Sequence, residues 1–205
     1  MKKRNIGSNL AHYWYWYVLA IAIPSLVWHL VFLGITAPRK EEKLVFFAGA
    51  YGFEGSALHD ALQAKKPQGI KRLDVYSYRI QDYTFAEMFT IHGGREADLL
   101  LLPESKIANY HDYFLPIQEK TYLENYVSDP VYYTSAGDDF PIGVRAYDKA
   151  SKSGALADFV HYEPETGEGE DYYFLFRASS PHVGKLGEKG KDDAALRLLR
   201  SAISL

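Results

Sequence analysis

The stretch "EADLLLLPESKI" (96–107) sets four consecutive leucines before Pro103, Glu104 and Ser105. A short, continuous apolar run that ends at a proline is typical of a strand buried on both faces of a sheet. Such strands occur mainly in parallel sheets whose two faces are covered by helices. The stretch therefore predicts an α/β domain in which Glu104 and Ser105 follow the carboxyl end of an interior strand.

The segments before this stretch alternate between strand and helix patterns. The run "KLVFFAGAY" (43–51) has strand length, and "IKRLDVYSYRI" (70–80) alternates as a strand does. Helix patterns at 55–66 and 83–94 separate the three strands. Strands that alternate with helices form parallel sheets with right-handed crossovers. We therefore expect a single three-layer α/β domain with a mainly parallel sheet, in which the first three strands have the order 2-1-3.

The second half of the chain is less regular. Strand patterns occur at 142–147 and 172–180, and "HYEPETGEGEDY" (161–172) reads as an exposed acidic loop or hairpin tip. The chain closes with an amphipathic helix pattern at 192–205, whose early aspartates suit a helix N-terminus. These elements complete one globular domain.

An apolar segment precedes the domain. Residues 13–35 carry no acidic or basic side chain other than His29, and this length is sufficient to span a bilayer. The aromatic cluster "YWYWY" at its start suits a membrane interface. We expect a basic N-terminal tail at 1–12, a transmembrane signal anchor at 13–35, a linker at 36–42 and an extracytoplasmic domain at 43–205, with the N-terminus in the cytoplasm of a single-pass protein of the cell membrane.

Composition excludes several classes of function. The chain has a formal net charge of -3, which argues against a nucleic-acid partner. It has no cysteine, which excludes disulfides, thiolate catalysis and thiolate metal sites. The histidines lack metal-ligand spacing, and no nucleophile motif is present. The sequence therefore predicts no metal, no cofactor and no enzymatic activity.

A ligand crevice is expected at the carboxyl ends of the parallel strands, where the strand order reverses. Residues that follow the three strands would line or border it, and these candidate ligand-binding residues are Tyr51, Phe53, Glu54, Tyr78, Arg79, Tyr83, Glu104 and Ser105. Glu104 either accepts a hydrogen bond from a sugar hydroxyl, an amine or a partner's basic residue, or caps the following helix in solvent. The aromatic rings either stack on a ligand or pack within the domain.

The order of these elements resembles the bacterial extracellular solute-binding proteins of the type II periplasmic binding-protein fold. The matching stretches are "KLVFFAGAYGFEGSALHDALQ", "ADLLLLPESKI", "DFPIGVRAYD" and "YYFLFRASSPHVGK". The resemblance implies a binding domain that acts with an ABC transporter. Members of that family have two lobes and about twice this length, and a lipid-anchored cysteine stands where this chain has an apolar segment. The chain therefore looks like a one-lobed, membrane-anchored relative.

Three functions follow as hypotheses. The first is a binding module that is accessory to ABC-type uptake of a sugar-like small-molecule solute, with the transporter permease or another binding protein as its partner. The second is a structural or regulatory interaction module at the cell envelope that has no small-molecule ligand. The third is an envelope hydrolase that works through carboxylates such as Glu54 and Glu104.

Overall fold

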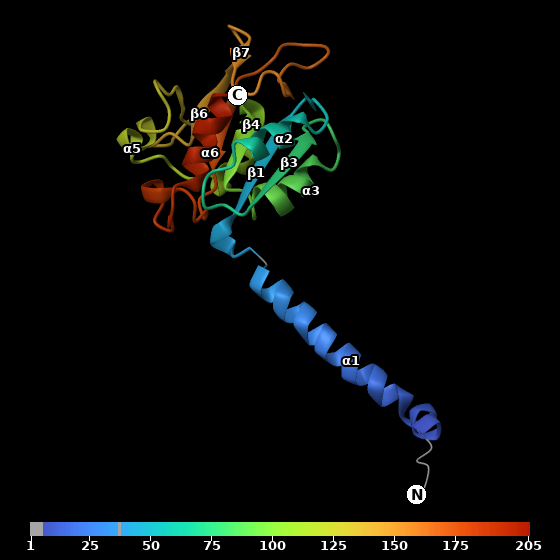
Figure 1. Ribbon diagram of the computed structural model, residues 1–205. Coiled ribbons are helices and arrows are strands. Elements are labelled where there is room, and N and C mark those ends of the chain that lie inside the picture. The colour runs from blue at the N-terminus through green and yellow to red at the C-terminus, as the bar shows by residue number, and fades with distance from the viewer. Residues whose placement is uncertain (1–5, 37) are drawn as a thin grey trace, which may run out of the picture. The chain divides into compact units, whose positions relative to one another are not determined.

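The computed structural model describes residues 6–36 and 38–205. The chain divides into two compact units, Met1–Arg39 and Lys40–Leu205. The first unit contains a single helix, and the second contains every strand and the remaining helices. Figure 1 traces the chain through both units.

Helix α1, Ile6–Thr36, is long and apolar enough over Tyr13–Phe32 to cross a membrane. At 1.5 Å per residue this 20-residue span extends ~30 Å, which matches the hydrocarbon thickness of a bilayer. None of the span is buried against other parts of the described chain. The apolar N-terminal helix of the prediction is therefore present, and it begins at Ile6, within the tail that was expected to precede it.

The domain is built on a seven-stranded sheet in which β1 lies between β3 and β4, parallel to both. Six strands follow the order β3-β1-β4-β9-β6-β5, and β7 pairs with β6. Their bounds are β1 Lys43–Ala50, β3 Arg72–Arg79, β4 Leu99–Pro103, β5 Tyr132–Tyr133, β6 Gly143–Asp148, β7 Ser153–Gly154 and β9 Tyr172–Phe176. A second, two-stranded sheet pairs β2, Gly52–Phe53, with β8, Val160–His161.

The sheet is mixed, whereas the sequence predicts a mainly parallel one. Strand β9 runs antiparallel to β4, and β6 runs antiparallel to β9. The reason is where the chain enters β9: the acidic loop leads into Tyr172 opposite Pro103, at the carboxyl end of β4. A strand that starts at that end must run back toward the other end of the sheet, so the parallel pairs of the sheet are those that join β1 to β3 and to β4.

Helices cover both faces of the sheet. Their bounds are α2 Ala57–Ala64, α3 Phe85–Met88, α4 Glu104–Ile107, α5 Lys120–Glu124 and α6 Ala194–Ile203, with shorter turns η1 Lys40–Glu42, η3 Ala108–Tyr113 and η4 Gly184–Leu186 and a π-helical segment η2 Phe89–Gly93. Figure 1 shows α2 and α6 in front of the strands. Their apolar residues join one buried cluster, and those of α3, η2 and α4 join another. The domain thus has three layers.

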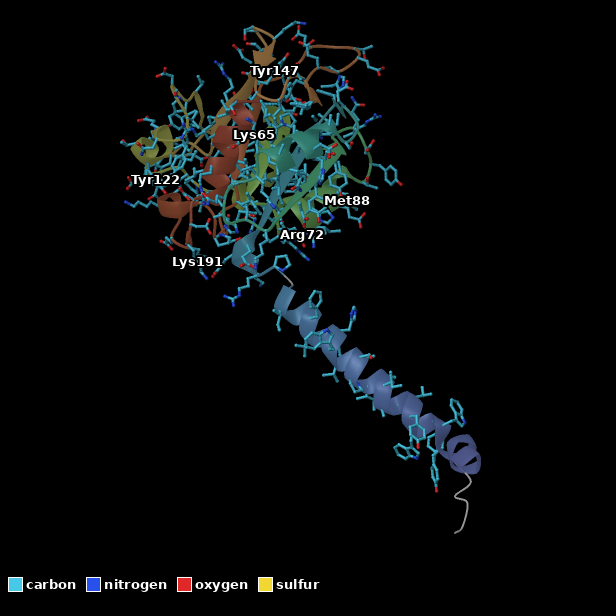
Figure 2. The ribbon with its side chains drawn as sticks, viewed as in Figure 1. Lys65, Arg72, Met88, Tyr122, Tyr147 and Lys191 are labelled. Carbon is cyan, nitrogen blue, oxygen red and sulfur yellow. The ribbon has the colours of Figure 1, made fainter. Side chains whose placement is uncertain are left out.

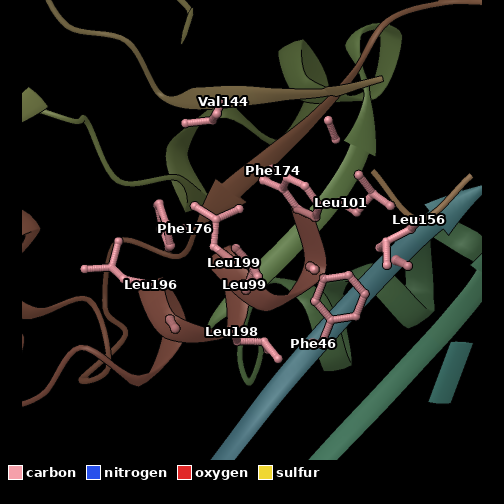
Figure 3. Close-up of a cluster of buried hydrophobic side chains, with 14 of the residues drawn as sticks. Phe46, Leu99, Leu101, Val144, Leu156, Phe174, Phe176, Leu196, Leu198 and Leu199 are labelled. Carbon is pink, nitrogen blue, oxygen red and sulfur yellow. The ribbon is translucent and has the colours of Figure 1, made fainter. Parts of the chain in front are cut away.

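The four leucines of β4 explain why this strand fixes the fold. Leu99 and Leu101 belong to the cluster beneath α2 and α6, whereas Leu100 and Leu102 belong to the cluster on the other face, and all four are fully buried. Successive side chains of a strand point to opposite faces, so an uninterrupted leucine run serves two cores at once. Figure 3 shows Leu99 and Leu101 packed with Phe46, Phe174 and α6.

Candidate functional site

The sequence predicts a crevice at the carboxyl edge of the sheet, between the ends of β1 and β4, and the loop 162–171 reaches both of these strand ends. This loop leads directly into β9, and the backbone N–H of Glu104 donates to the carbonyl of Asp171 at 3.0 Å. The loop places the side chain of Glu170 between the two strand ends.

Glu170 is held there by three donors from two elements. The backbone N–H of Ser105 donates to Oε2 at 2.9 Å, and the Ser105 hydroxyl donates to Oε1 at 3.0 Å. The Tyr51 hydroxyl donates to Oε1 at 3.3 Å. An ionised carboxylate is an acceptor only, so a cluster of N–H and O–H donors suits it. The arrangement is therefore a carboxylate-binding site that the chain's own side chain occupies.

The electrostatics of Tyr51 agree with this contact. Burial, followed by the negative charge of Glu170, raises the pKa of the Tyr51 hydroxyl above its ordinary value. The phenol therefore keeps its proton at neutral pH and remains a donor to the carboxylate. Two of the predicted ligand residues, Tyr51 and Ser105, are thus brought together around one group.

A cavity of about 420 Å³ lies beside this contact. Tyr51, Phe53 and Arg79 line it together with residues of the acidic loop, including Glu163 and Glu165. Within reach of this edge, Glu54 pairs with His161 at 2.7 Å, and both side chains are more than half exposed. An exposed pair of this kind adds little stability. The structure therefore gathers Phe53 and Arg79 at the same edge as Tyr51 and leaves Glu54 engaged with the β8 strand.

The other predicted residues lie elsewhere. The Tyr78 ring packs 5.6 Å from the Phe47 ring, in the cluster on the α3 face of the sheet. Tyr83 is 98% exposed. Glu104 lies near Tyr133 and Tyr173, and burial, followed by the charges of Asp171 and Glu104, raises the pKa of Tyr173 to about 12.

Glu54 and Glu104, the two carboxylates named in the third hypothesis, have different neighbours in the described residues. Glu54 contacts His161 and Glu104 lies beside two tyrosines, so the two acids share no contact in the part of the chain that the structure describes. Over the same described ranges, no three His, Asp or Glu side chains gather as a metal site.

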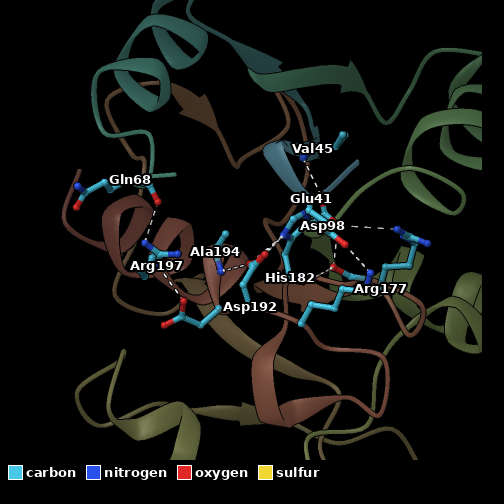
Figure 4. A network of polar contacts seen from close by, with 12 residues as sticks. Glu41, Val45, Gln68, Asp98, Arg177, His182, Asp192, Ala194 and Arg197 are labelled. Atoms are coloured by element: carbon cyan, nitrogen blue, oxygen red, sulfur yellow. Dashed lines mark hydrogen bonds and ion pairs between the residues drawn. The ribbon is translucent and has the colours of Figure 1, made fainter. Parts of the chain in front are cut away.

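A second polar cluster, which the sequence did not reveal, lies at the opposite, amino edge of the sheet (Figure 4). Asp98 precedes β4 and is buried; its Oδ2 accepts the backbone N–H of Val45 at 2.9 Å, and its Oδ1 accepts the Ser180 hydroxyl at 2.7 Å. The Arg177 guanidinium lies 3.8 Å from the same carboxylate. Burial raises the pKa of Asp98, and burial lowers the pKa of Arg177. The cluster ties the starts of β1 and β4 to the end of β9.

This cluster has the composition of a Ser-His-Asp triad without its geometry. The His182 Nδ1 lies 2.9 Å from Asp192, and the His182 backbone N–H donates to the Ser180 hydroxyl at 3.1 Å. Ser180 donates its proton to Asp98, so the imidazole is not the base that accepts it. The sequence signal that could have revealed the cluster is Asp98 directly before four leucines, because a buried carboxylate requires partners.

Comparison with known proteins found no family model, no curated protein and no solved structure that matches this chain.

Proposed function

We propose that the chain is a membrane-anchored interaction module of the cell envelope, with α1 as a single-pass anchor and the α/β domain on the extracytoplasmic side. In this proposal the domain resembles one lobe of a solute-binding protein and contacts a partner protein instead of enclosing a free solute. The observation that carries the choice is Glu170, whose carboxylate accepts hydrogen bonds from Tyr51 and Ser105, two of the residues expected to bind a solute.

The internal carboxylate makes capture of a free solute weak. Glu170 is attached to the same chain as its donors, and a group on a short linker has an effective concentration in the millimolar range. A free carboxylate must compete with that concentration for Ser105 and Tyr51. One lobe also buries less of a ligand than the enclosed pockets in which small molecules usually bind.

The surface around the crevice favours a partner with basic side chains. The loop 162–171 carries Glu163, Glu165 and Glu168 in addition to Glu170 and Asp171, and no lysine or arginine. Tyr83, which follows β3, adds an exposed aromatic ring of the kind that is enriched in protein interfaces. A transporter permease or another binding protein in the same membrane is the partner that the resemblance suggests.

The test uses the full chain in detergent and its thermal unfolding against sugars, amino acids, peptides and acetate. We expect no saturable shift for the wild type. Glu170→Ala should empty the crevice and gain a shift with acetate, because a ligand that binds only the folded state raises its apparent stability. Glu168→Ala is the matched control: it removes an exposed carboxylate from the same loop and should gain nothing.

The opposite outcome would select the first hypothesis, a module that binds a small-molecule solute. Three donors around one carboxylate also suit an anionic solute that displaces Glu170. A saturable shift of the wild type that is lost in Ser105→Ala would assign solute binding to this crevice and overturn the interaction module.

A further inference from the structure

A sizeable cavity lies at the amino edge of the domain, where β1 begins. Its volume is about 820 Å³. Figure 2 shows Arg72 and Lys191 at this end of the domain and Tyr147 at the other end. The charged residues that line the cavity are the cations Lys40, Lys43, Arg95, Arg177, Lys189 and Lys191 and the acids Glu96, Asp98 and Glu188.

The cations here contrast with the rest of the domain. All 26 acidic residues of the chain lie after Lys40, so the domain as a whole is negatively charged. The acidic loop 162–171 lies at the opposite edge, and the basic residues gather at the amino edge. The lining of this cavity therefore has more cations than acids, and an anionic group would be attracted to it.

Several of these cations have capacity for a further anion. Arg95 and Lys189 are exposed and form no ion pair with the described residues. Arg177 has five N–H donors, of which Nε donates to the Ala97 carbonyl at 2.5 Å and Nη1 donates to Ser179. Lys191 is engaged with Glu41 at 2.5 Å. The cavity thus joins exposed ammonium and guanidinium groups to a largely buried arginine.

The floor of the cavity contains an unpartnered polar atom. His182 is 1% exposed, its Nδ1 pairs with Asp192, and its Nε2 is buried without a hydrogen-bond partner among the described residues. A buried ring nitrogen normally has a partner. Asp98, the acid at the floor, already accepts hydrogen bonds on both oxygens. Among the described residues that line the cavity, the buried side-chain atom without a partner is therefore the His182 Nε2.

One cation of the cavity follows the anchor closely in the sequence. Lys40, which lines the cavity, stands four residues after Thr36, the last residue of α1. Basic residues that follow a membrane span directly are the ones that meet lipid headgroups.

We propose that this cavity binds the phosphate group of an anionic phospholipid at the surface of the membrane that α1 anchors to, an inference that rests on the proposed anchoring. Lysine and arginine clusters beside a membrane segment are attracted to anionic lipids. Free phosphate offers the same chemistry, and the closeness of Lys40 to α1 in the sequence favours the lipid as its source. The contact would hold the domain with its basic edge on the bilayer and its acidic edge toward a partner.

The test measures lysine acetylation by mass spectrometry on the full chain in nanodiscs. Nanodiscs of phosphatidylcholine are compared with nanodiscs that also contain phosphatidylglycerol. We expect the acetylation rates of Lys40, Lys189 and Lys191 to fall several-fold when phosphatidylglycerol is present. Lys65 and Lys149 are exposed outside the cavity and serve as internal controls whose rates should not change.

A charge reversal makes the test specific. Arg95→Glu should abolish most of the protection at Lys40 and Lys189, because it places a negative charge at the cavity. Arg200→Glu changes the net charge equally on an exposed part of α6 and should leave the protection intact.

Three outcomes would overturn the inference. The first is an unchanged rate at the cavity lysines, and the second is equal protection of Lys65 and Lys149. The third is equal protection by inorganic phosphate in phosphatidylcholine nanodiscs, which would assign the cavity to a free anion. Failure of the anchoring itself is distinguishable, because the chain would then fail to insert into nanodiscs of either composition.

Discussion

At the carboxyl edge of the sheet a carboxylate, Glu170, is held by one N–H group and two hydroxyl groups. At the amino edge another carboxylate, Asp98, is held by a backbone N–H, a serine hydroxyl and an arginine. Glu170 sits on a surface loop, whereas Asp98 is only 3% exposed. The same chemical group therefore closes a crevice at one edge and joins three core strands at the other.

The difference in burial between Glu170 and Asp98 indicates which edge of the domain suits binding and which edge contributes to stability. Residues 163–171 of the loop are exposed or half-buried, whereas Tyr162 before them is part of the core, so opening of the Glu170 contact alone would expose little of the sheet. The Asp98 cluster cannot open without exposing the starts of β1 and β4. Local opening occurs in the parts of a protein that have few buried contacts. The carboxyl edge is therefore the edge of the sheet at which contacts can open locally.

The largest expected effect is that of Asp98→Ala. It leaves Arg177, whose side chain is 13% exposed, without its carboxylate, and the Val45 N–H and Ser180 hydroxyl without their acceptor. Removal of one partner from a buried ion pair costs about 3 to 5 kcal/mol. Denaturant unfolding of the full chain in detergent, followed by the circular dichroism of its tyrosines, measures the loss.

Asp148→Ala is the matched variant at the carboxyl edge. The carboxylate of Asp148 accepts from the Ala150 N–H and the Ser151 hydroxyl in a surface turn. Its removal should cost much less than the removal of Asp98, because water can replace the hydrogen bonds of an exposed carboxylate. Equal losses in the two variants would contradict the distinction between the two edges.

An intermediate effect is expected for Gly190→Ala at the rim of the amino-edge cavity. A Cβ at Gly190 would clash with the backbone carbonyl of Gly184, and both glycines lie in one tight loop with the Gly184 N–H bonded to Asp192. Steric overpacking of this kind costs about 1 to 3 kcal/mol. The same unfolding experiment measures it, with Gly169→Ala in the acidic loop as the control, because a Cβ there meets only the flexible Glu163 side chain.

The sequence predicted the elements that follow from local patterns. The apolar runs at 43–51 and 96–107 predict β1 and β4, because a continuous apolar run indicates a strand that is buried on both faces. It could not predict that β9 runs antiparallel, because the direction of a strand depends on where a distant loop delivers the chain. The antiparallel direction of β9 is what makes the sheet mixed.

Part of the candidate site could also be predicted from local sequence patterns. Tyr51 and Ser105 follow predicted strands, so the strand-end rule places both at the carboxyl edge. Glu170 stands more than sixty residues away from Ser105 in an acidic loop, and no local pattern distinguishes it from Glu165 or Glu168. Glu104 was the stronger candidate from position alone, and its contacts lie with Tyr133 and Tyr173 instead.

The smallest effect is expected for Tyr126→Phe, and it depends on pH. The Tyr126 hydroxyl donates to Asp193 at 2.6 Å, and this hydrogen bond, followed by Arg197, lowers the pKa of the Asp193 carboxyl below its ordinary value. A carboxyl whose pKa is lower in the folded state stabilises the fold above its unfolded pKa, and the stabilisation is lost as the pH falls through the lowered value. Both groups are partly exposed, so we expect a loss of about 1 kcal/mol at neutral pH.

The pH dependence distinguishes the hydrogen bond between Tyr126 and Asp193 from packing contacts, which do not depend on the charge of a carboxylate. Below the folded pKa of Asp193 the wild type also lacks the ionised acceptor, so the gap between the wild type and Tyr126→Phe should narrow in acid. Unfolding curves at neutral and at strongly acidic pH measure the stability difference between the wild type and Tyr126→Phe. Tyr83 is 98% exposed, so Tyr83→Phe is the control that should change neither curve. A gap of the same size at both pH values would mean that the hydroxyl stabilises the start of α6 without the charge of Asp193.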